Sequence, residues 1–135
     1  MIPDLQSSLL CDDVRQERNG KFILIGLFDG IGVPKFPAAF QRLCMVNRWC
    51  CGTGEFIQKT RIIQPDGTTP LISGKDVKVK LNNNEATATC VEMFMNVKFE
   101  KPGTYWIEIL LDGSLKLRYP LRAAQIKTKP PEDKP

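Results

Sequence analysis

The chain has 135 residues, of which 42% are hydrophobic and 25% are charged, so it can form one folded domain around one core. Its formal net charge of +4 is a mild surplus and only weak evidence for a nucleic-acid partner, since specific binders concentrate basic residues on one face. It contains no histidine, which excludes Ser-His and Cys-His nucleophile pairs, histidine acid–base catalysis and histidine-containing metal sites.

The first predicted elements are two strands that form a hairpin. Residues 7–15 predict the first strand, and Asn19-Gly20 is a strong signal for a tight hairpin turn. Lys21–Asp29 predicts the second strand, and its residues are apolar on both faces. We therefore expect this second strand in the middle of a sheet that is covered on both sides.

The middle of the chain predicts a loop followed by three more strands. Residues 30–38 contain two prolines and predict a stiff loop. Residues 39–51 fit either helical spacing or strand alternation, and the neighbouring β elements favour a strand. Turn residues then separate strands expected at 55–64 and 75–81, with a loop at 70–74.

The last third predicts one long strand and a closing hairpin. In Ala86–Phe99, alternation is expected to bury one face, made of Val91, Met93, Met95, Val97 and Phe99. Asp112-Gly113 predicts the tight turn of the hairpin. Its first strand is expected to turn Tyr105, Ile107, Ile109 and Leu111 inward, and its second strand to turn Leu115, Leu117, Tyr119 and Leu121 inward.

About eight short strands with Gly, Pro and Asn turns predict an all-β domain, either a sandwich or a barrel. The run that is apolar on both faces favours a single antiparallel β-sandwich of immunoglobulin type. This domain is expected over residues 1–126, and residues 127–135 predict a flexible tail rich in lysine and proline.

The chain is expected to remain in the cytoplasm. It has no run of about 20 apolar residues of the kind that spans a membrane. Its first residues lack the basic and apolar regions of a secretory signal peptide. We therefore expect no membrane partner.

The chain carries five cysteines: Cys11, Cys44, Cys50, Cys51 and Cys90. An odd number without a secretory signal favours reduced thiols. We expect them to be small apolar residues in the core or in an interface. A zinc site of four thiolates is the alternative, and it requires Cys11, Cys44 and Cys90 to meet one of the adjacent pair.

Four segments carry a family resemblance: Cys11–Glu17, Asn19–Asp29, Phe36-Pro37 and Pro102–Ile109. Together they resemble a family of small bacterial β-sandwich proteins of unknown function. The resemblance covers roughly residues 7–122 and implies a compact β-sandwich in a bacterial cytosol. It implies no activity and assigns no functional residues.

Carboxylates near the start of the chain are the candidates for a calcium site or for hydrolysis. Asp12, Asp13 and Glu17, with Asp29, would bind calcium if loops brought them together. Adjacent aspartates on a strand point to opposite faces, however, and no calcium-loop spacing is present. We therefore expect no catalytic residue, no cofactor and no metal, and a carboxylate or calcium-dependent hydrolase is the least favoured alternative.

An apolar stripe is the candidate interface. Phe94, Trp106 and Leu110 lie out of phase with the expected core positions, so we expect them on an outer face. Tryptophan is a frequent anchor in protein interfaces. The competing interpretation is that the loop over 30–38 or the first strand covers these residues within the monomer.

A ligand face is the alternative site. Trp49 lies beside a cation at a strand end, and Lys116, Arg118 and Arg122 form a basic face on the last strand. These residues fit stacking on a carbohydrate or contact with a polyanion, although a core tryptophan and a solvated face explain them as well. The favoured prediction is a non-enzymatic bacterial protein that acts by protein–protein contact, including contact with a second copy as a homodimer.

Overall fold

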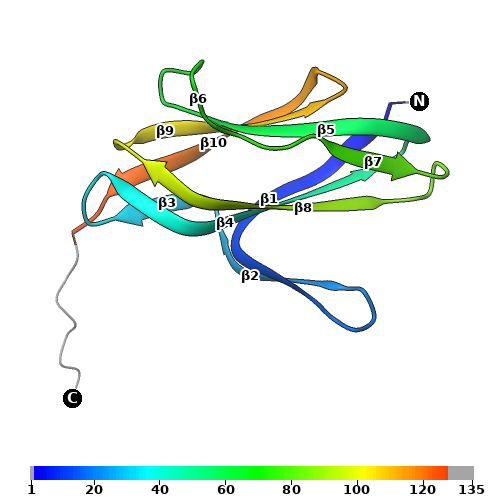
Figure 1. Ribbon diagram of the computed structural model, residues 1–135, viewed down its shortest axis with the longest axis horizontal. Coiled ribbons are helices and arrows are strands. Elements are labelled where there is room, and N and C mark those ends of the chain that lie inside the picture. Colours follow the sequence, from blue (N-terminus) through cyan, green and yellow to red (C-terminus); the bar gives the residue numbers. More distant parts are fainter. Residues whose placement is uncertain (1, 128–135) are drawn as a thin grey trace.

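The computed structural model describes residues 2–127, and within that range it contains β-strands and no helix (Figure 1). An all-β fold is therefore confirmed. The segment 39–51 is a strand, as favoured, and two more strands than expected lie in segments predicted to be loops. The strands are β1 (Asp4–Gln16), β2 (Phe22–Phe28), β3 (Gly30–Val33), β4 (Ala38–Cys50), β5 (Gly54–Ile63), β6 (Pro70–Ser73), β7 (Val77–Leu81), β8 (Ala88–Phe99), β9 (Gly103–Leu111) and β10 (Ser114–Gln125).

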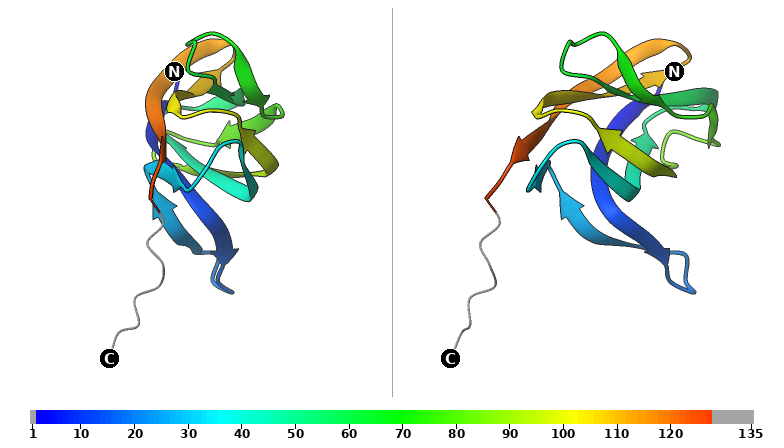
Figure 2. Two further views of the ribbon diagram at one scale, coloured as in Figure 1. Left: turned by 90° about the vertical axis from the view of Figure 1, so that its left-hand side faces the viewer. Right: turned by 60° about the vertical axis from the view of Figure 1, so that its left-hand side comes forward.

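The strands form two sheets that face each other as two layers (Figures 1 and 2). We call them sheet A, with the order β2-β1-β4-β8, and sheet B, with the order β3-β10-β9-β5-β6 and β7 also paired with β5. Sheet A is antiparallel throughout. Sheet B is mixed, because the chain crosses after β2 from one sheet to the other and β3 then runs parallel to β10. The expected purely antiparallel arrangement is therefore wrong at this one pair.

Two predictions made from the sequence, on membrane spans and on the C-terminal tail, concern the described range. Within the part of the chain that the structure describes, no helix has the length and apolar content needed to cross a membrane. The tail expected over 127–135 lies, apart from its first residue, outside the described residues.

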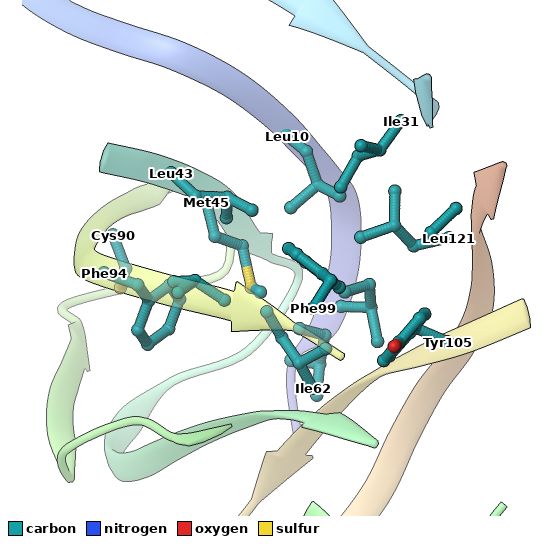
Figure 3. Close-up of a cluster of buried hydrophobic side chains, with 14 of the residues drawn as sticks. Leu10, Ile31, Leu43, Met45, Ile62, Cys90, Phe94, Phe99, Tyr105 and Leu121 are labelled. Carbon is teal, nitrogen blue, oxygen red and sulfur yellow. The ribbon is translucent and has the colours of Figure 1, made fainter. Parts of the chain in front are cut away.

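Buried aromatic side chains join the two sheets at the centre of the core. Phe99 on β8 packs edge-on against Tyr105 on β9, with ring centroids 4.9 Å apart, and against Phe40 on β4 at 5.5 Å. Leu10, Met45, Ile62 and Leu121 close around this contact, as Figure 3 shows. The edge-to-face arrangement of rings adds to the stabilisation from buried apolar area.

The position of β2 contradicts the prediction from its composition. Among residues 2–127, β2 pairs only with β1, which makes it an edge strand of sheet A and not a central strand. Phe22, Leu24 and Phe28 are half-buried, whereas the side chains between them face solvent. β1 occupies the central position instead, because it pairs with β2 on one side and with β4 on the other.

The alternation of β8 is also out of phase with the prediction. Met93 is 48% exposed, and Val91 and Met95 are exposed as well, whereas Phe94 lies in the core (Figure 3). Asn96 has a φ of 54°, a left-handed conformation that breaks the regular alternation of a strand. Val97 and Phe99, which follow it, are buried as expected.

The final strand deviates for a similar reason. The pairing of β10 with β9 shifts between Leu115 and Leu117, so that Leu115 pairs with Leu110 and not with an inward residue. Leu115 and Leu117 are both exposed, against the expectation, whereas Leu121 is fully buried and Tyr119 is half-buried. A β-bulge of this kind inserts one residue and exchanges the faces on either side of it, which accounts for Leu115. It does not account for Leu117, which lies after the bulge and pairs with the buried Ile109.

Two alanine substitutions test which residues of β8 face the core: Phe94, as in the structure, or Met93, as the sequence pattern predicts. Phe94→Ala should lower the free energy of unfolding by about 3–5 kcal/mol, because it empties a packed site between the sheets. Met93→Ala, at the exposed neighbouring position, should change it by no more than about 0.5 kcal/mol. Urea unfolding at equilibrium measures both values, and a larger loss for Met93→Ala would contradict the structure.

Candidate functional site

The predicted interface residues do not form one surface. Phe94 is only 6% exposed and belongs to the core, because the alternation of β8 before Asn96 turns it inward. The expectation that it faces outward is therefore wrong. Trp106 and Leu110 are half-buried on β9 in the other sheet. The guanidinium of Arg118 lies 4.7 Å from the centre of the Trp106 ring and covers part of it.

The predicted ligand face is also divided. Trp49 is fully buried, and its Nε1 donates to Gln58 Oε1 at 2.8 Å, so its ring cannot stack on a ligand. Arg118 stacks on Trp106 and lies 3.6 Å from Glu108, a carboxylate that it shares with Arg61 at 2.7 Å. Lys116 is half-buried and Arg122 is exposed on the same strand.

The early carboxylates do not converge on one point. Asp13 lies 3.3 Å from both Arg15 and Arg42 and accepts a hydrogen bond from the Val14 amide. Partial burial alone would raise the pKa of Asp13, but these contacts together hold it below its ordinary value. Asp12 is exposed, and residues 2–127 contain no group of three His, Cys, Asp or Glu side chains that could hold a metal ion.

The cysteines are free thiols. Cys11 and Cys44 are cross-strand neighbours on β1 and β4, and both are fully buried. Burial raises the pKa of each of these two thiols, so they remain protonated at neutral pH. Val14 and Leu24 on the hairpin pack over them.

A seam of polar side chains, which the sequence did not reveal, lies between the two sheets. We define the polar seam as Asn47 and Trp49 on β4, Gln58 and Thr60 on β5, and Glu92 on β8. Gln58 Oε1 accepts from both residues of β4, and Gln58 Nε2 donates to Glu92 Oε1 at 3.2 Å. Thr60 Oγ1 donates to the same carboxylate oxygen at 2.7 Å. One feature of the sequence could have indicated this seam: if Cys90 and Phe94 are assigned to the inner face of β8, Glu92 between them also points inward.

Glu92 lies beside an open cavity at the edge of the molecule. The cavity has a volume of about 380 Å³, and the segment from Ile72 to Lys75 lines it opposite β8. Gly74 is required there, because a Cβ at this position would lie 2.5 Å from both Glu92 Oε2 and Thr60 Oγ1. Burial raises the pKa of Glu92, although the hydrogen bonds from Thr60 and Gln58 act in the opposite direction. This arrangement offers one carboxyl that holds its proton more tightly than an exposed carboxyl does.

Exposed apolar side chains collect on the two edge strands of sheet A. On β2 they are Ile23, Ile25 and Leu27, and the last is 60% exposed. Leu9 on β1 lies beside Leu27. On the opposite edge, β8 exposes the three apolar residues described above. Exposed apolar side chains that gather on edge strands in this way are candidates for contact with another chain.

The raised pKa of Glu92 predicts a pH-dependent stability. Because the folded chain binds this proton more tightly than the unfolded chain, the free energy of unfolding should fall as the pH rises above about 4.5, the ordinary value of this group. The fall should end once the pH passes the raised pKa. Glu92→Gln should remove this part of the decline, since the amide does not titrate and its oxygen still accepts from Thr60.

Urea unfolding between pH 4 and pH 7 measures the effect. Glu85→Gln is the matched control, because Glu85 is an exposed glutamate in the turn that precedes β8. Its pH profile should follow that of the unmodified chain. Equal slopes for Glu92→Gln and the unmodified chain would contradict the burial of this carboxyl.

Comparison with known proteins places the chain in a family without giving it an activity. A family of unknown function, DUF6941, matches residues 6–124, which is most of the chain and nearly all of the described strands. No curated protein matches the sequence. The expectation of a family of unknown function is thereby confirmed. The chain belongs to the family DUF6941.

Proposed function

We propose that the chain is a non-enzymatic β-sandwich protein, of immunoglobulin-like type, that acts through protein–protein contact. The contact surface that we propose is the free edge of the β1–β2 hairpin, with the exposed apolar side chains Leu9, Ile23, Ile25 and Leu27 around it. We call it the hairpin surface. The hairpin surface takes the place of the interface predicted from the sequence, which consisted of Phe94, Trp106 and Leu110.

One observation carries this proposal: a strand that is apolar on both faces occupies an edge of its sheet. Edge strands of soluble proteins usually carry charges, prolines or a cover that prevents pairing with other chains. β2 has no charged residue or proline between Phe22 and Phe28. Such a strand is stable in solution when another chain covers it, and its side chains then lose contact with water.

The alternative functions have less support. A module for carbohydrate or polyanion would have to use Lys116 and Arg122, since Trp49 is enclosed and Arg118 is paired with Glu108. A hydrolase needs two placed acid–base groups. The cavity beside Glu92 has Lys75 as its other charged lining residue, and the early carboxylates lie apart from it.

Photo-crosslinking from a single position tests the proposal. Leu27→p-benzoylphenylalanine in the full chain, expressed in its host and irradiated, should give an adduct of one discrete mass. Lys59→p-benzoylphenylalanine is the matched control, because Lys59 is exposed on β5 in the opposite sheet and should give none. Adding Ile25→Lys to the first variant should abolish the adduct. Equal yields from positions 27 and 59, or none from position 27, would contradict a contact at the hairpin surface.

A further inference from the structure

The cavity beside Glu92 has the size and position of a site for a small molecule. It lies between β8, an edge strand of sheet A, and the connection from β6 to β7 in sheet B. Its volume of about 380 Å³ is at the lower end of the range for ligand pockets, which is about 300–1,000 Å³. A ligand that fills it would therefore be small.

Most of the cavity wall is apolar. The apolar lining residues are Ile72, Val77, Met93, Phe94 and Met95. The two methionines are exposed, and their flexible side chains can adapt to the shape of a bound molecule. An apolar group in the cavity would remove this surface from water, so the walls favour a ligand with an apolar body.

Glu92 offers one carboxylate oxygen to the cavity. Its Oε1 accepts hydrogen bonds from Gln58 and Thr60, which hold the carboxyl in place. Its Oε2 accepts none from residues 2–127 and lies beside Gly74, another lining residue. A carboxylate that is partly buried and lacks a second partner favours a cation, because a charge-assisted hydrogen bond then offsets its loss of water.

Lys75 supplies a charge of the opposite sign. It lines the same cavity from the wall that faces β8. Within the described range its ammonium forms no ion pair, either with Glu92 or with another carboxylate. A ligand with a single charge would leave one of these two residues without a partner, whereas a ligand with both charges is complementary to each of them.

We propose that this cavity binds a small zwitterion with an apolar side chain, of the chemical class of the apolar amino acids. The ammonium of the ligand pairs with Glu92 Oε2, and its carboxylate pairs with Lys75. Its side chain lies against the apolar wall. This site is independent of the hairpin surface, because β2 and β8 are the two opposite edges of sheet A.

The two charged residues contribute unequally to the affinity. Glu92 is partly buried and held by two hydrogen bonds, so its contact with the ligand ammonium is the stronger one. Lys75 is exposed, and ion pairs of exposed lysines contribute little. Glu92 therefore supplies most of the polar binding energy, and Lys75 distinguishes an amino acid from an amine.

Isothermal titration calorimetry of the full chain with L-leucine and two of its analogues tests the proposal. The first analogue, 3-methylbutylamine, lacks the carboxylate and should bind about threefold more weakly than leucine. The second, 4-methylpentanoate, lacks the ammonium and should bind about tenfold more weakly or worse. Equal affinity for leucine and for the amine would overturn the role of Lys75 and the zwitterion with it.

Two variants assign each ligand charge to its residue. Glu92→Gln should weaken leucine binding by about tenfold or more and should not weaken binding of 4-methylpentanoate. Lys75→Gln should weaken leucine binding about threefold and should not weaken binding of 3-methylbutylamine. Lys80→Gln is the matched control, since Lys80 is exposed on β7 outside the cavity, and it should leave all three affinities unchanged. Circular dichroism establishes that each variant remains folded.

A measurement without any substitution keeps the test decisive. In the unmodified chain with ¹³C-labelled methionine methyl groups, leucine should shift the signals of Met93 and Met95, which line the cavity. The signal of Met45 should not move, because this side chain is fully buried outside the cavity lining. Leucine that gives neither heat nor a shift of Met93 and Met95 would overturn the site.

Discussion

The hydrogen-bonded polar seam is the constraint on which the packing of the two sheets depends. Gln58 is fully buried, and its side chain can be satisfied only if Trp49 and Glu92 on sheet A stand opposite it. A buried amide without partners costs more than apolar packing recovers, so this contact allows one alignment of the layers. Apolar contacts alone, such as those around Phe99, would tolerate small shifts.

The pairing of β1 explains why the apolar strand β2 lies at an edge. β1 pairs with β4 and is a central strand of sheet A, and its Leu10 lies in the core between the sheets. β2 can then add only to the outer side of β1, beyond the area that sheet B covers. Its half-buried residues use both faces, because Leu24 packs on the cluster around Cys11 and Cys44 whereas Phe28, beyond the left-handed Gly26, packs on the core between the sheets. The exposed apolar residues of β2 are left without cover among the described residues.

Local patterns predicted the strands well and their faces less well. Turn residues such as Asn19-Gly20 and Asp112-Gly113 marked hairpins correctly, because tight turns depend on the conformation of two residues. Alternation misplaced Met93 and Leu115, because one left-handed residue and one bulge each exchange the faces of a strand. Neither irregularity has a distinctive residue, since asparagine and lysine also occur in regular strands.

The sequence by itself determined that this chain is an all-β protein without histidine chemistry, and that Phe22–Phe28 is an apolar strand. Only the tertiary structure decided which strands became edges, that Phe94 and Trp49 are enclosed, and that Glu92 joins a polar seam. The reason is physical. Secondary structure follows from the preferences of neighbouring residues, whereas exposure follows from which distant strands pair, and that choice depends on the packing of the whole chain.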